Sequence, residues 1–327
     1  MVGAGGARRP ALDVLLPPAQ HAAHVVDEVR DGLQRPKARL PLGDLADTRT
    51  RSLWSELDDA ERYYPLRCTR ALAAAHGEAI AGQVKPRSLV VVGGADEQVV
   101  ATLATAARPH GLGEVVAIGP VGPRLGATCA ALETALPWAT VRGAVADPLA
   151  QLAEVAFARP ALLYVPGPTF GRLDGPGRAR LLAAARRSMG PGDHLLVGLD
   201  LTTDRERALG AYDDPEGLHG ERARNALAVL AREFAAEVDP DGWEPVVTWD
   251  ERGHVVEVDL RARSPQRIAI ASLDLERWFA ADEAIELERN ATFRPSGIGA
   301  QLALAGLDAC GWWATAGDDY ALVLAST

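Results

Sequence analysis

Short apolar runs recur through the middle of this 327-residue chain, and alanine-rich stretches and turns rich in glycine and proline separate them. Each run is four to six residues long, which is typical of buried strands. Five runs alternate with helical patterns, at residues 89–92, 115–118, 140–145, 161–165 and 194–199. This alternation predicts an α/β fold, a Rossmann-like parallel sheet with helices on both faces.

The pattern changes after Asp200. A helical stretch at 225–236 precedes closely spaced runs of alternating polarity, at residues 246–248, 254–260, 267–271 and 284–288. Alternation of this kind is typical of an antiparallel sheet with one solvated face. We interpret the segment 204–288 as an inserted, smaller α+β domain that binds the substrate.

The two ends of the chain complete the predicted organisation. Residues 1–20 are rich in glycine, proline and alanine, which indicates a flexible extension. Helical patterns follow between residues 50 and 83, with a break at Tyr63-Tyr64-Pro65. A helix at 299–307, with Trp312-Trp313 packing on it or stacking on a ligand, and a strand at 320–325 return to the first domain. The Rossmann-like domain is therefore expected to comprise 21–203 and 289–327.

Composition restricts the classes of partner. The formal net charge is −10 and no basic tract occurs, so binding to nucleic acid through bulk electrostatics is not expected. No apolar stretch has the length of a membrane helix. The histidines and the three cysteines have no metal-ligand spacing, and the cysteines form no disulfide framework, which favours a cytoplasmic protein without a metal site.

Seven short motifs occur together in one order between residue 30 and the end of the chain. They are Gly-Leu-Gln at 32–34, Tyr-Tyr-Pro-Leu-Arg at 63–67, Met-Gly-Pro-Gly-Asp-His-Leu-Leu-Val-Gly-Leu-Asp at 189–200, Ala-Tyr-Asp-Asp-Pro at 211–215, Arg-Asn at 224–225, Phe-Arg-Pro at 293–295 and Trp-Trp at 312–313. Jointly they resemble the histidine-specific, S-adenosylmethionine-dependent Nα-methyltransferases of ergothioneine biosynthesis. The resemblance implies S-adenosylmethionine as cofactor and a methyltransferase domain joined to a substrate domain.

The cofactor positions match that family only in part. The family has a Glu in the first strand and then Gly-Ser-Gly-Thr, whereas this chain has Val91 and then Gly93, Gly94 and Ala95. The two glycines are the candidate cofactor-binding positions, and the Cβ of Ala95 occupies space where the backbone should approach the cofactor. The family's ribose-binding Asp after the second strand has no counterpart in Ile-Gly-Pro-Val-Gly-Pro at 118–123.

Three carboxylates near these positions have open interpretations. Asp147 matches the family's Asp near the adenine amino group, and it is equally interpretable as a helix N-cap ahead of Pro148. Asp96 and Glu97 lie in the glycine turn, where either carboxylate could replace the lost ribose contact if the nucleoside sat differently.

The substrate positions are also mixed. By the resemblance, Tyr63, Tyr212 and Glu288 match residues that contact the bound histidine, although Tyr63 also fits a packed turn. Arg172 stands where the family has the Asn that holds the amino-acid head group, and Asn290 stands where it has a Ser near the imidazole. An arginine at 172 places positive charge where an amine and a sulfonium would meet.

Two further positions depart from the family. Ala46 replaces a Tyr and Arg222 replaces a Phe, while Asp213-Asp214 fits a turn or helix cap. Methyl transfer to an amine depends mainly on positioning, so a methyltransferase has few groups to lose besides its binding sites. No catalytic acid or base is assigned.

These departures predict a histidine Nα-methyltransferase-family protein with degenerate cofactor and substrate sites. Such a pseudoenzyme would bind a small amino-acid-like molecule or act as partner or regulator of an active methyltransferase. The alternative is an active S-adenosylmethionine-dependent N-methyltransferase acting on histidine or another amino-acid-like amine. A third possibility is a binding protein that attracts a small anion through Arg172 and Arg222.

Overall fold

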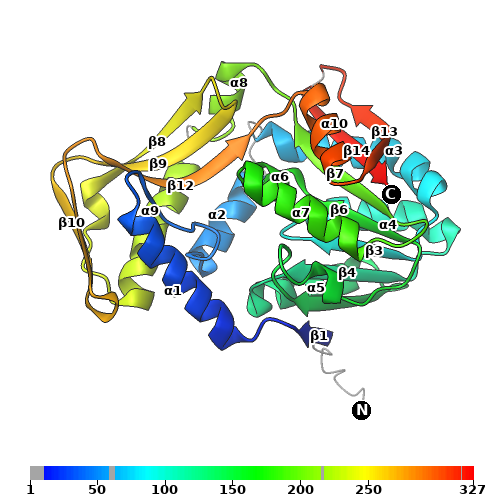
Figure 1. Ribbon diagram of the computed structural model, residues 1–327, viewed down its shortest axis with the longest axis horizontal. Coiled ribbons are helices and arrows are strands. Elements are labelled where there is room, and N and C mark those ends of the chain that lie inside the picture. The colour runs from blue at the N-terminus through cyan, green and yellow to red at the C-terminus, as the bar shows by residue number, and fades with distance from the viewer. Residues whose placement is uncertain (1–10, 59–62, 215–216, 318) are drawn as a thin grey trace, which may run out of the picture. The chain divides into compact units, whose positions relative to one another are not determined.

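The computed structural model describes residues 11–58, 63–214, 217–317 and 319–327, and its contacts group the chain into two units (Figure 1). The first unit comprises the segment that ends at His21, together with Cys68–Leu201 and Arg294–Thr327. The second unit comprises Ala22–Arg67 and Thr202–Phe293. Each unit is therefore built from segments that are distant in the sequence.

The first unit is organised around an eight-stranded sheet of order β1-β5-β4-β3-β6-β7-β14-β13. Six strands run parallel: β1 (Ala11–Val14), β3 (Ser88–Val92), β4 (Glu114–Gly119), β5 (Thr140–Val145), β6 (Ala161–Val165) and β7 (His194–Asp200). The last two strands, β13 (Asp308–Ala314) and β14 (Tyr320–Ser326), are antiparallel additions beside β7. All five strands predicted from the apolar runs are present.

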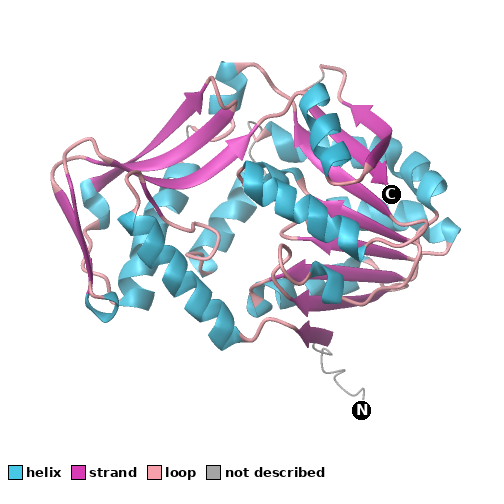
Figure 2. Cartoon of the chain, viewed as in Figure 1, coloured by secondary structure: helices cyan, strands magenta, loops and turns pink. Residues whose placement is uncertain are grey.

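Helices cover both faces of this sheet (Figure 2). Leu196 of β7 packs in one core with α3 (Tyr64–Val84), α4 (Glu97–Ala107) and α5 (Gly122–Ala135). The next residue, Val197, points to the opposite face because side chains alternate along a strand. There it meets α6 (Gly167–Gly171), α7 (Gly175–Ser188) and α10 (Pro295–Leu304). The predicted α/β architecture is confirmed.

The second unit combines helices with a four-stranded sheet. Its helices are α1 (Pro18–Gln34), α2 (Thr48–Asp58), α8 (Arg205–Gly210) and α9 (Leu218–Phe234). The sheet order is β2 (Ala38–Arg39), β12 (Ala284–Ala291), β9 (Val255–Ala262) and β8 (Trp243–Asp250). Only β2 pairs in parallel, and β10 (Gln266–Ile270) forms a separate hairpin with β11 (Leu275–Phe279).

The two faces of the four-stranded sheet differ in polarity. Val256, Val258 and Leu260 of β9 are buried. On the opposite face the ammonium of Lys37 lies 2.7 Å from a carboxylate oxygen of Glu257 and 3.1 Å from one of Asp259. The alternation read from the sequence therefore corresponds to one apolar and one charged face, as expected for an antiparallel sheet.

Two expectations from the sequence about domain limits are wrong in part. Residues 11–14 form β1, which pairs with β5, and α1 begins at Pro18, so the flexible extension does not hold for residues 11–20. Residues 1–10 lie outside the described residues. The contacts group Ala22–Arg67 with the second unit, whereas the sequence placed this segment in the first. Trp312 and Trp313 lie on β13, a strand that contacts α10, and Trp313 packs on the core beside His76.

In the part of the chain that the structure describes, no helix is long and apolar enough to cross a membrane.

Candidate functional site

The first candidate region is the glycine turn that joins β3 to α4. Gly93 has φ of +88°, and a Cβ there would lie 2.7 Å from Thr169 Oγ1, so this position requires glycine. Its N–H donates to the carbonyl of Ile118 at 2.9 Å. A Cβ at Gly94 would meet nothing within 4 Å. The turn thus combines one fixed position with one that leaves room for another molecule.

The carboxylates beside this turn already have partners. Asp96 is the N-cap of α4, and its Oδ1 accepts from the N–H of Val99 at 2.9 Å. Arg70 donates to both of its oxygens, from Nε to Oδ1 at 3.2 Å and from Nη2 to Oδ2 at 2.7 Å. The Oε1 of Glu97 accepts from Thr128 at 3.2 Å. A ribose hydroxyl would compete with these contacts for either carboxylate.

No carboxylate follows β4. The strand ends at Gly119, and α5 begins at Gly122 after Val121, which supplies no side-chain cap. The missing ribose carboxylate noted in the sequence therefore has no substitute between residues 119 and 124.

Asp147 lies directly after β5 and shapes a turn. Its Oδ1 accepts from the N–H of Leu149 at 2.8 Å, and its own N–H donates to Gln151 Oε1 at 3.0 Å. No α-helix starts here, since the next element is a short 3₁₀ turn at Leu152–Glu154. Asp147 acts as a local cap, and an adenine contact stays a prediction.

Aromatic side chains gather in the second unit around two of the predicted substrate residues. The rings of Tyr63 and Tyr212 meet edge to face at 5.8 Å, and His219 lies 5.8 Å from the first ring and 5.4 Å from the second. All three residues are buried. The structure therefore brings Tyr63 and Tyr212 together, and it adds His219, which no motif in the sequence pointed to.

Glu288 is held by a buried arginine. Arg222 Nη2 donates to Glu288 Oε2 at 2.5 Å, and Asn290 Nδ2 donates to Glu288 Oε1 at 3.0 Å. Arg222 is 2% exposed and Glu288 5% exposed. His219 Nδ1 lies 3.4 Å from the same guanidinium nitrogen. Both oxygens of Glu288 are thus engaged by groups of the protein itself.

This pairing changes the interpretation of Arg222. The sequence suggested that Arg172 and Arg222 together attract a small anion, but the charge of Arg222 is balanced by Glu288. Arg172 lies in the first unit, half-buried, where α6 ends. The structure thus assigns Arg222 to a buried ion pair rather than to an anion site, and the role of Arg172 stays a prediction.

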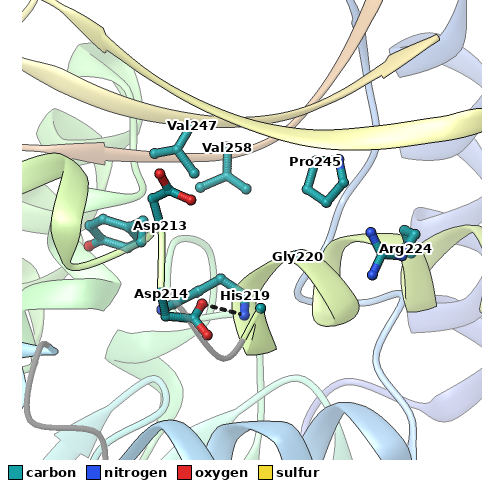
Figure 3. A pocket seen from close by; sticks show the side chains of 10 residues that line it. Asp213, Asp214, His219, Gly220, Arg224, Pro245, Val247 and Val258 are labelled. Atoms are coloured by element: carbon teal, nitrogen blue, oxygen red, sulfur yellow. Dashed lines mark hydrogen bonds between the residues drawn. The ribbon is translucent and has the colours of Figure 1, made fainter. Parts of the chain in front are cut away.

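A cavity of about 140 Å³ lies in the second unit beside the aromatic cluster (Figure 3). It is bounded by residues 212–214, by Gly217, by the start of α9, and by β8 and β9. Asp214 caps α9 by accepting from the N–H groups of Leu218 at 2.5 Å and His219 at 2.9 Å. The cap interpretation is therefore confirmed for Asp214, whereas Asp213 points into the cavity.

Metal binding finds no support in the described residues, where no three His, Cys, Asp or Glu side chains are placed to hold an ion.

The parallel sheet, its antiparallel β14 and β13, and the glycine turn after β3 define the fold of class I S-adenosylmethionine-dependent methyltransferases. A sequence profile described as "Histidine-specific methyltransferase, SAM-dependent" matches residues 25–327. The chain belongs to this family, as the motifs predicted, and S-adenosylmethionine is the cofactor on which the family depends.

Two sequence relatives agree with this assignment. The chain is 33% identical to a histidine N-alpha-methyltransferase of Mycobacterium tuberculosis (strain CDC 1551 / Oshkosh), over 91% of this chain and 94% of the relative. It is 31% identical to the protein of the same name from Mycolicibacterium smegmatis, over 91% and 93%. Among solved structures, the CcbJ methyltransferase from Streptomyces caelestis is 14% identical, with a TM-score of 0.44 over 77% of this chain and 95% of that chain. The family assignment rests on the sequence matches.

Proposed function

We propose that this protein is a member of the histidine Nα-methyltransferase family with degenerate cofactor and substrate sites, a catalytically impaired pseudo-methyltransferase. The observation that carries the proposal is the buried ion pair between Arg222 and Glu288. In the family pattern this Glu meets the substrate histidine, and a Phe stands in place of Arg222. Here the arginine supplies the cationic partner from within the chain.

Displacing that arginine is costly. A buried charge that loses its counter-charge destabilises a protein by about 3–5 kcal/mol. A histidine ligand that took over Glu288 would leave the guanidinium of Arg222 in the interior without its carboxylate. The ion pair therefore opposes the binding of a histidine to Glu288.

The cofactor side supports the same proposal. A carboxylate that holds ribose hydroxyls contributes about 1.5–3 kcal/mol, so its loss weakens binding roughly tenfold or more. No carboxylate follows β4, and the oxygens of Asp96 are engaged by Arg70 and by the α4 cap. The open space at Gly94 can still admit a nucleoside, which would bind without its ribose anchor.

Calorimetry with S-adenosylmethionine and S-adenosylhomocysteine tests the cofactor half of the proposal. We expect dissociation constants well above the micromolar range. Binding in the micromolar range or better, about −8 kcal/mol, would contradict the proposal as stated.

The variant Arg222→Phe tests the substrate half. It removes the internal cation and leaves Glu288 available, so we expect histidine to bind at least about tenfold more tightly than to the unaltered protein. Arg232→Phe is the matched control, since Arg232 lies on the same helix with its side chain 53% exposed. Equal histidine affinity in the unaltered protein and in Arg222→Phe would show that the ion pair does not block the site.

The second candidate function is an active N-methyltransferase for histidine or another amino-acid-like amine. It is favoured by the survival of Tyr63, Tyr212 and Glu288 at family positions and by the open turn at Gly94. Transfer of a radiolabelled methyl group to histidine, or to any amine in an amino-acid panel, would establish this candidate instead.

If the protein does not transfer methyl groups, we propose that it regulates an active methyltransferase as its partner. An active methyltransferase of ergothioneine biosynthesis is one such partner. The three cysteines are free thiols, which suits the reducing cytoplasm in which such a partner would act. Co-purification with the active enzyme checks this role, and a lack of any complex would remove it.

A further inference from the structure

Two charged side chains that line the cavity of the second unit have no partner among the described residues. The exposed carboxylate of Asp213 and the half-buried guanidinium of Arg224 form no hydrogen bond or ion pair with any of these residues, including each other. Figure 3 shows Asp213 near Val247 at one end of the cavity and Arg224 near Pro245 at the other. The cavity therefore presents opposite charges at separate places.

The neighbours of Arg224 on α9 make its situation unusual. Arg222 pairs with Glu288, Glu221 accepts from Arg49 at 2.6 Å, and Arg232 pairs with Asp47 at 3.2 Å. Arg224 is half-buried and has no such carboxylate in the described part of the chain. Asp213 contrasts in the same way with Asp214, whose oxygens both accept from the start of α9.

Between the two charged side chains, the strand side of the cavity is apolar, while Asp214 and His219 line it from the side of α9. Val247 of β8 and Val258 of β9 face it, and Pro245 closes one side (Figure 3). A Cβ on Gly220 would lie 2.9 Å from Pro245 Cγ, so helix and strand already approach as closely as they can. A ligand here meets a short aliphatic surface between two charged ends.

We infer that this cavity binds a small zwitterion, with its ammonium on Asp213 and its carboxylate on Arg224. An arginine fork suits a carboxylate because it can donate two parallel hydrogen bonds. A volume of about 140 Å³ is close to the ~150 Å³ cavity that accepts benzene, which restricts the ligand to a free amino acid or betaine of that size. Tyr212 borders both this cavity and the predicted substrate position, but neither Glu288 nor Arg222 lines the cavity, so its two charged ends are distinct from that ion pair.

Calorimetry of the full chain with glycine, alanine and glycine betaine tests the inference. We expect at least one of them to bind with a dissociation constant below about 1 mM. Methylamine and acetate, which carry one charge each, should bind at least about tenfold more weakly. If none of the zwitterions binds below about 10 mM, the inference is wrong.

Two variants assign the charges. Asp213→Asn and Arg224→Gln should each weaken zwitterion binding by roughly tenfold to a hundredfold, the contribution of a hydrogen bond to a charged group. Arg232→Gln, on the same helix and paired outside the cavity, should leave it unchanged. Unaltered binding in both cavity variants would overturn the assignment.

The variant Arg222→Phe also distinguishes a failure of this inference from a failure of the proposed function. Arg222→Phe should change histidine binding and leave zwitterion binding in the cavity within about twofold. Loss of zwitterion binding in Arg222→Phe, with retention in Asp213→Asn, would assign the ligand to Glu288 and overturn the inference. Methyl resonances of Val247 and Val258 in the unaltered protein give an independent readout, since they should shift when the zwitterion binds.

Discussion

Arg222 and Arg224 lie two residues apart on α9, yet their environments are opposite. Arg222 is buried and donates to Glu288 at 2.5 Å, whereas Arg224 lies half-buried at a cavity without a carboxylate partner among the described residues. A guanidinium cannot lose its charge, so deep burial requires a counter-charge, and partial exposure does not. The same residue type therefore serves the folded structure at one position and remains available to a ligand at the other.

Among the variants that test this contrast, Glu288→Gln should cause the largest loss of stability. It removes the carboxylate from the buried Arg222, so the free energy of unfolding should fall by about 3–5 kcal/mol. Urea denaturation followed by circular dichroism measures the change.

Arg224→Gln is the counterpart for the second arginine. Because Arg224 has no partner to lose among the described residues, the free energy of unfolding should stay within about 0.5 kcal/mol of that of the unaltered protein. If the free energy of unfolding fell equally in Glu288→Gln and Arg224→Gln, the distinction between a structural and a ligand-accessible arginine would be wrong.

A pH titration extends the comparison to a buried carboxylate. Burial raises the pKa of Asp259 from its usual value near 3.8 to about 6, against the opposing effect of Lys37 and reinforced by Glu257 and Glu286. The folded protein therefore binds this proton more tightly than the unfolded chain does. The stability that it contributes is full below pH 3.8 and is lost as the pH rises through about 6.

The size of that loss is at most ~3 kcal/mol, and Asp259→Asn should abolish it. Urea midpoints between pH 4 and 7 for both proteins isolate the contribution, because all other titrating groups are shared. If the urea midpoints of the two proteins change with pH in parallel, Lys37 offsets the free-energy cost of burying Asp259, as Glu288 does for Arg222.

Gly93 and Gly94 differ in a similar way, since close contacts fix the first and not the second. The expected difference in stability is the smallest of the three comparisons. Gly93→Ala places a Cβ at φ of +88° and 2.7 Å from Thr169, so it should destabilise the protein by about 1–3 kcal/mol. Gly94→Ala meets no atom within 4 Å and should change the stability by less than ~1 kcal/mol. Thermal unfolding distinguishes the two, and a larger loss at Gly94 would contradict the geometry.

Much of the fold was predictable because its signals are local. Continuous Val and Leu runs identify buried parallel strands, and β3, β4 and β5 lie within a residue of their predicted bounds. The two-residue β2 and the edge strand β1 were missed, since such short strands depend on pairing with a neighbour rather than on their own sequence.

Individual residues of the candidate site were predictable from the sequence, but the contacts between them were not. The resemblance pointed to Tyr63, Tyr212 and Glu288, but the partner of Glu288 lies 66 residues earlier in the chain. The helical period of α9 places Arg222 on the buried face with Ala226 and Leu230 and leaves Arg224 off it, but it does not reveal which carboxylate Arg222 meets. Long-range ion pairs of this kind require the folded structure.

The interleaving of the two units has a consequence at the level of the gene. The chain passes between them at residues 21–22, 67–68, 201–202 and 293–294, so neither unit is encoded by one continuous segment. No single truncation removes one unit and spares the other. A change that alters one unit while both stay folded must therefore fall within the interleaved segments, because no terminal deletion removes one unit alone.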